Sequence, residues 1–156
     1  MAELALPRAL HALGKRAVGE AVARRAGTVE AEHVLLAILA RPTEPAAAQL
    51  AALGLDHHAL IVALDAERQR SLGVSGIVLV GPTATATEPR VTTPGWGASV
   101  RDALRGANKP PAGTGRAGAL EIELALAVLA APLGTVPRAL ALAGIDRARL
   151  AAALTL

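Results

Sequence analysis

The sequence predicts an all-α fold of eight helices, arranged as two four-helix units. Hydrophobic residues make up 53% of the 156 residues but aromatic residues only 1%, so the core must be built from Leu, Val, Ile and Ala, which suits closely packed helices. Apolar residues recur at helical spacing along most of the chain. A long pattern in the first half also returns in the second half, and such a repeat indicates a duplicated unit.

The repeated pattern runs from Glu32 to Asp56 and returns from Glu123 to Asp146. Each copy is a Leu- and Ala-rich helix stopped by proline, followed by a second helix and a Gly-Leu-Asp or Gly-Ile-Asp joint. The matching residues lie 90 positions apart: Pro42 and Pro132, Leu50 and Leu140, Gly54 and Gly144, Asp56 and Asp146. We therefore expect one domain over residues 1–156, with repeat one at 1–70, a linker at 71–93 and repeat two at 94–156.

Local start and stop signals place the individual helices. Gly27 is expected to end the first helix, Thr28 and Thr43 to cap the second and third, Gly54 to take a left-handed conformation and Asp56 to cap the fourth. Ile77–Val80 is expected to form a short extended segment. The predicted helices are Pro7–Arg25, Val29–Ala40, Pro45–Leu53, His57–Arg70, Pro94–Ala107, Ala119–Ala131, Thr135–Ala143 and Asp146–Leu154.

Composition excludes several classes of function. The chain has no cysteine, which rules out disulfides and thiolate chemistry and fits a cytoplasmic location. The net charge is only +3. The first helix is basic, but the chain lacks a dense basic cluster and an aromatic stacking platform, so nucleic acid is a disfavoured partner. The N-terminus does not read as a signal peptide, and the apolar runs are too short to span a bilayer.

Three motifs were weighed for chemistry, and none predicts an enzyme, a metal or a cofactor. Val78–Thr87 begins like a phosphate-binding loop but lacks its second glycine and its lysine, so we interpret it as linker. His57 and His58 diverge by about 100° on a helix and do not form a metal pair. Glu32 and His33 could act as a catalytic pair, but no nucleophile accompanies them. A carboxylate in the first turn of a helix also has an ordinary electrostatic explanation.

The segments Glu32–Leu39 and Gln49–Asp56 resemble the amino-terminal repeat domain of the Clp/Hsp100 protein unfoldases, most closely the actinobacterial ClpC type. Thr93-Pro94 resembles the entry to the second repeat of that family. The resemblance implies a pseudo-twofold pair of four-helix units without catalytic activity. In the family this domain sits on an AAA+ motor, docks adaptors and recruits protein substrates. The chain is expected to be a divergent, free-standing homologue rather than an excised domain.

The resemblance also implies candidate ligand-binding residues. In ClpC relatives the acidic residue of each Glu-His motif contributes to a site for phosphorylated arginine. Glu32 and His33 match that motif, whereas the position 90 residues after Glu32 is Ile122. A second site therefore depends on the flanking Glu121 or Glu123. Mycobacterial relatives also bind cyclic peptide antibiotics through aromatic side chains, and this chain has neither Phe nor Tyr.

We accordingly expect a binding module of a Clp-type system, whose partners are an unfoldase, an adaptor, a substrate or a Clp-targeting cyclic peptide. Within this class, an adaptor that modulates the protease and a decoy that sequesters an antibiotic remain alternatives. A helical-repeat regulator that binds a small molecule or nucleic acid is the rival from another class. Trp96 and His33 are the candidate residues for a small-molecule pocket between the two units.

Overall fold

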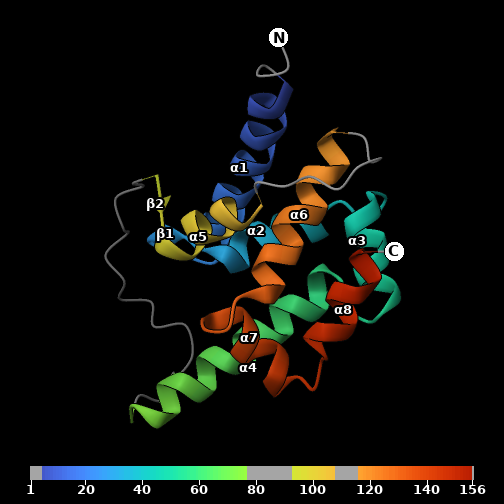
Figure 1. Ribbon diagram of the computed structural model, residues 1–156. Helices are drawn as coiled ribbons and strands as arrows, with labels where there is room; N and C mark the ends of the chain where they lie inside the picture. Colours follow the sequence, from blue (N-terminus) through green and yellow to red (C-terminus); the bar gives the residue numbers. More distant parts are fainter. Residues whose placement is uncertain (1–4, 77–92, 108–115, 156) are drawn as a thin grey trace.

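The structure is a computed structural model that describes residues 5–76, 93–107 and 116–155 (Figure 1). Within these ranges the chain is all-α apart from one pair of very short strands, which confirms the predicted class. The elements are α1 (Ala5–Ala23), β1 (Thr28–Val29), α2 (Ala31–Leu39), α3 (Pro45–Ala52), α4 (His57–Val74), β2 (Gly95–Trp96), α5 (Ala98–Gly106), α6 (Arg116–Ala130), α7 (Thr135–Leu142) and α8 (Arg147–Leu154).

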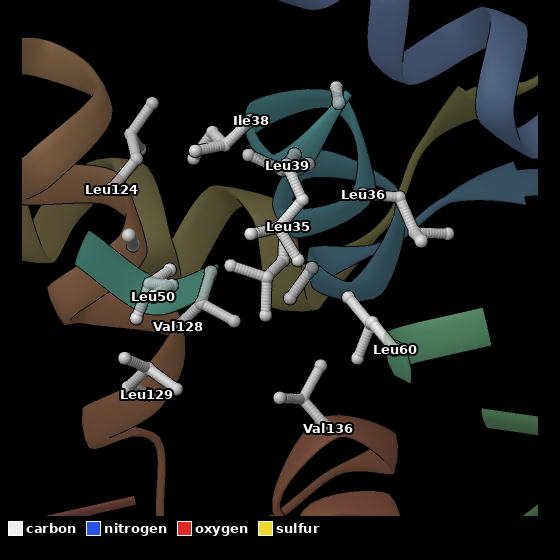
Figure 2. Packing of buried hydrophobic residues seen from close by; sticks show 14 of the residues in the cluster. Leu35, Leu36, Ile38, Leu39, Leu50, Leu60, Leu124, Val128, Leu129 and Val136 are labelled. Atoms are coloured by element: carbon white, nitrogen blue, oxygen red, sulfur yellow. The ribbon is translucent and has the colours of Figure 1, made fainter. Parts of the chain in front are cut away.

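Helix α2 lies at the centre of the molecule, and eight of its nine residues are buried. A helix that is apolar on all sides must be surrounded by other elements. Helices α1, α3 and α4 pack on it from the same half of the chain, and α5, α6 and α7 from the other half. Figure 2 shows Leu35, Leu36, Ile38 and Leu39 of α2 in one buried cluster with Leu50, Leu60, Leu124 and Val136, which come from four other helices. Each fully buried leucine contributes about 1.5–3 kcal/mol of apolar transfer free energy.

The helix packings of the two halves correspond when α1 is matched with α5, α2 with α6, α3 with α7 and α4 with α8. Helix α4 packs on α7, and α3 packs on α8. Helix α1 packs on α6, and α5 packs on α2. Helices α2 and α6, which correspond to each other in the two halves, also pack on each other. Each half is therefore covered by helices of the other half.

The two Gly-Leu-Asp-type joints close the preceding helix in the same way. Gly54 and Gly144 both have positive φ, at 91° and 72°. The next residue in each joint donates its N–H across the end of the preceding helix, Leu55 to the Leu50 carbonyl at 3.0 Å and Ile145 to the Leu140 carbonyl at 2.9 Å. This is the bond that closes a helix on a left-handed residue. The side chains of Asp56 and Asp146 then cap α4 and α8.

Several predicted boundaries and caps are wrong. Helix α4 continues four residues beyond Arg70 to Val74, and its last turns are exposed. Helix α1 ends at Ala23 and Arg25 follows with a left-handed φ of 55°, so the helix stops before Gly27, which was expected to end it. Thr28 lies in β1, so Glu30 stands at the N-cap of α2, and Glu44 rather than Thr43 stands at the N-cap of α3.

The entry to α5 also differs from the prediction. Residues Gly95 and Trp96 form β2, so α5 begins at Ala98 rather than Pro94. Strand β2 pairs in parallel with β1, with Thr28 opposite Gly95 and Val29 opposite Trp96. The extended segment expected at Ile77–Val80 lies outside the described residues. Among the described residues no single helix is both long enough and apolar enough to cross a membrane. Two bent pairs of consecutive helices meet the criteria of length and composition only when each pair is taken together.

The two joints generate a prediction about stability. Substituting alanine for Gly54 or Gly144 forces a side chain into the left-handed region, so each variant is expected to lose about 1–2 kcal/mol of unfolding free energy. Gly73 is the matched control, because it lies within α4 with ordinary φ and open space around it. Gly73→Ala is expected to gain about 0.5–1 kcal/mol. Urea denaturation measures the unfolding free energy of all three variants. Equal changes in the three would contradict the left-handed conformation of Gly54 and Gly144.

Candidate functional site

The N-terminus of α2 is capped by residues from both halves of the chain. The His33 ring accepts a hydrogen bond at Nδ1 from the Glu30 backbone N–H, at 2.9 Å. The Glu30 carboxylate accepts bonds from the Ser99 backbone N–H, at 3.3 Å, and from the Ser99 hydroxyl. The Ser99 oxygen in turn accepts from the Ala31 N–H at 2.8 Å. Helix N-termini leave free N–H groups, and here a carboxylate, an imidazole and a hydroxyl satisfy them jointly.

Gly97 gives the Glu30 carboxylate the room that it occupies. A Cβ atom at position 97 would collide with that carboxylate, although the φ of Gly97, −79°, suits any residue. The Gly97 N–H also donates to the Val29 carbonyl at 2.9 Å, which continues the β1–β2 pairing. Glycine is thus required here by close approach and not by backbone conformation.

Next to this cluster of Glu30, His33, Gly97 and Ser99, the helices α2, α5, α6 and α7 enclose an open groove of about 940 Å³. We call it the acidic groove. Its floor is apolar and includes Leu126 and Val136, while Glu32, Asp102 and Glu123 line it together with Glu30. No Lys, Arg or His is among the described residues that line it. The first residues of α7, Thr135 and Val136, lie at the same groove.

Glu32 and Glu123 are the two carboxylates of the acidic groove that no described side chain of the protein engages. Both are half-buried, and neither has a hydrogen-bond or ion-pair partner among the described side chains. Burial raises the pKa of the Glu32 carboxyl above its usual range, against the smaller opposing effect of a backbone N–H. In contrast, Asp102 pairs with Arg105 at 3.0 Å, and the Glu30 carboxylate accepts hydrogen bonds from Ser99.

The other two predicted ligand-binding residues lie elsewhere. His33 is 3% exposed and its ring caps α2, so it does not line the acidic groove. Glu121 is buried on another side of α6, where it pairs with Arg16 of α1 at 2.7 Å. Burial raises the pKa of Glu121, and the Arg16 guanidinium opposes that rise. Of the two acids that flank Ile122, Glu123 therefore lines the same groove as Glu32 and Glu121 does not, while Ile122 itself is in the core.

A second groove lies between α1 and α5, and we call it the tryptophan groove. It has a volume of about 900 Å³ and is lined mainly by apolar side chains, including Leu10, Leu13 and Leu104. Trp96 of β2 borders it and is 46% exposed. The ring packs against Gly14, where a Cβ atom would stand 3.2 Å from it. Of the two residues predicted for a small-molecule pocket, Trp96 therefore borders this groove and His33 does not line it, and small-molecule binding stays a prediction.

Sequence reasoning missed Glu30, Ser99, Asp102 and Thr135. The spacing of Glu30 and His33 is the i, i+3 spacing of a capping box, and it was the one available signal. Glutamate is not a preferred N-cap residue, which is why Thr28 was chosen instead. Nothing local marks Ser99, because its partner Glu30 lies 69 residues away in the sequence.

Among the described residues no group of three or more His, Asp or Glu side chains is arranged to hold a metal ion. Comparisons with known protein families, curated proteins and solved structures find no match to this chain. The chemistry of the two grooves is therefore the basis on which a function can be argued.

The close approach at Gly97 generates a second prediction. Gly97→Ala is expected to lower the unfolding free energy by about 1–3 kcal/mol, because the new methyl group displaces the Glu30 carboxylate from Ser99. Gly95→Ala is the matched control two residues earlier, where a Cβ atom meets nothing within 4 Å. That variant should stay within about 0.5 kcal/mol of the parent. Thermal or urea denaturation compares the two variants. Similar losses of unfolding free energy would contradict the close approach of the Glu30 carboxylate to Gly97.

The capping role of His33 generates a prediction about pH. Burial lowers the pKa of the His33 imidazole, and its Nδ1 must be unprotonated to accept from Glu30. The unfolded chain then binds a proton more readily than the folded one. His33 consequently contributes full stability above its unfolded pKa of about 6.5, and this contribution is lost as the pH falls through the lower folded value.

The test compares the parent with His33→Gln between about pH 7.5 and pH 5. Glutamine can accept the same N–H bond but does not titrate, so the variant should lose less stability than the parent as the pH falls. The raised pKa values of Glu32 and Glu121 act with the opposite sign, because their protonation favours the folded state. These carboxyls are present in both proteins, so the difference between the two curves isolates His33. Parallel curves would contradict the role assigned to Nδ1.

Proposed function

We propose that this protein is a non-enzymatic binding module of a Clp-type protein-quality-control system, built as a pseudo-twofold duplication of a four-helix unit. The resemblance of Glu32–Asp56 to the Clp amino-terminal repeats is one support. The left-handed glycine and the helix-closing bond shared by the joints at Gly54 and Gly144 are another. The exchange of packing partners between the halves, with α4 on α7 and α3 on α8, is what a twofold pair of units requires.

The observation that carries the functional part of the proposal is that Glu32 and Glu123 line one groove in which no Lys, Arg or His is among the described lining residues. Carboxylates pair with guanidinium N–H groups in charge-assisted bonds, and an arginine side chain has an apolar stem that suits an apolar floor. Glu32 is the family's acidic residue, and Glu123 supplies the second carboxylate that the substitution at Ile122 would otherwise remove.

The same groove offers groups for a phosphate. Helix α7 begins there after Gly134, and the N–H groups of Thr135 and Val136 have no partner within the helix. A helix N-terminus carries a partial positive charge that favours anions, and the Thr135 hydroxyl adds a donor. Phosphoarginine combines a guanidinium with a phosphate, so its two ends match the two kinds of group in the acidic groove. We therefore propose phosphoarginine-marked protein segments as its ligand.

Capture of a Clp-directed cyclic peptide is a second candidate function, and the tryptophan groove is the observation that favours it. The groove is predominantly apolar, and its volume lies within the range of ligand pockets. Trp96 is the only aromatic side chain of the protein, so it replaces the Phe and Tyr contacts of the mycobacterial relatives. This candidate corresponds to a decoy that sequesters an antibiotic.

Calorimetric titration with a phosphoarginine peptide tests the first proposal. The parent is expected to bind, and Glu32→Gln and Glu123→Gln are each expected to weaken binding by about 10-fold or more, because each removes one charge-assisted bond. The matched control is Glu44→Gln, a half-buried carboxylate that pairs with Arg41 outside the groove. It should leave the affinity unchanged.

The unphosphorylated arginine peptide is the ligand control, and equal binding of both peptides would contradict a role for the α7 N-terminus. No binding by the parent would remove phosphoarginine as the ligand. A cyclic peptide that binds equally well to the parent and to Glu32→Gln would instead favour the second candidate.

A further inference from the structure

The tryptophan groove carries positive charge at its border. Lys15 of α1 and Arg101 of α5 line it and are exposed, and no Asp or Glu is among the described residues of its lining. Neither cation has a carboxylate partner within the described part of the chain. Among the other exposed cations, Arg41 and Arg105 pair with acids three residues away, whereas Arg25, Arg68 and Arg70 have no carboxylate partner among the described residues.

The apolar side chains that line the groove are only partly covered by the protein itself. Leu10, Val18 and Leu104 are half-buried, and Trp96 is 46% exposed. A volume of about 900 Å³ accommodates several side chains of a partner. Two helices, α1 and α5, form its walls, which is the setting in which amphipathic helices insert a stripe of apolar residues into a groove.

We propose that the tryptophan groove docks an acidic amphipathic helix of a partner protein. Apolar residues of that helix at positions i, i+3 or i+4, and i+7 fill the groove against Trp96 and Leu104. Carboxylates that flank this stripe pair with Lys15 and Arg101, and they set the orientation of the helix and speed its association. This inference rests on the tryptophan groove alone, and it does not depend on phosphoarginine binding in the acidic groove.

Charge separates this occupant from an uncharged cyclic peptide in the same groove. An uncharged ligand gains only from the apolar floor, so reversal of the two cations would leave its affinity largely intact. An acidic helix loses both ion pairs and meets two repulsive charges instead. The border charges therefore decide between the two occupants, and the acidic groove plays no part in the comparison.

The experiment uses the full chain and Trp96 fluorescence, which reports on this groove because the chain has no other Trp and no Tyr. The probe is a helical peptide of about 15 residues with leucine at the i, i+3, i+4 and i+7 positions and glutamate elsewhere. We expect saturable binding with a blue shift of the Trp96 emission, weakened several-fold when NaCl is raised from about 50 to about 500 mM.

The double variant Lys15→Glu/Arg101→Glu is expected to bind this peptide about 10-fold or more weakly. The matched control is Arg68→Glu/Arg70→Glu, which makes the same change in net charge on the exposed end of α4, away from the groove. It should bind like the parent. All four positions are exposed, and circular dichroism verifies that both variants fold.

The proposal would be overturned if the parent did not bind the acidic peptide at concentrations up to about 1 mM. It would also be overturned if Lys15→Glu/Arg101→Glu bound the peptide as well as the parent does, or if the two double variants lost affinity equally. Equal binding of a peptide with lysine in place of glutamate would contradict it as well. Binding to phosphatidylserine vesicles without binding to the peptide would also overturn it, because the cations would then serve a lipid surface. An absence of phosphoarginine binding by the parent protein would leave this result unaffected, so the two proposals fail separately.

Discussion

The burial of α2 on all sides is the constraint on which the rest of the structure depends. Eight of its nine residues are removed from solvent, and a single four-helix unit cannot cover so many faces. The second half of the chain must therefore supply α5, α6 and α7. The polar end of α2 is enclosed by the same packing, so its N–H groups need partners inside the protein. Glu30, His33 and Ser99 supply them, and Gly97 leaves the space that the carboxylate requires.

The features that sequence reasoning placed correctly are those decided by neighbouring residues. Gly54 and Asp56 act within one turn of their own helices, and the same rules apply to Gly144 and Asp146, so all four conformations follow from local chemistry. The start of α2 was misplaced because its cap depends on Ser99, which no local pattern connects to Glu30. Pairing of Thr28 with Gly95 likewise draws Thr28 into a strand and removes it from the cap that it was expected to form.

The candidate site was predictable in its residue types and not in its arrangement. Glu32, Glu121 and Glu123 could all be named from the sequence, because they surround the repeated motif. Only the packing of α6 decides that Glu123 lies in the acidic groove while Glu121 pairs with Arg16 on another side. The two grooves differ in sign, one with carboxylates and the other with Lys15 and Arg101. The molecule therefore presents surfaces of opposite charge that can distinguish two classes of ligand.

The position of α2 also determines when the chain can fold during its synthesis. The ribosome delivers the first four helices well before Ser99 and α6, and until then α2 lacks half of its covering. Its leucines remain exposed to water over that interval, in a state that favours aggregation or binding by a chaperone. The cooperative core can form only when most of the chain has emerged, since the contacts that complete it join residues far apart in sequence. The nascent chain is therefore most prone to aggregate in the interval before α6 has emerged.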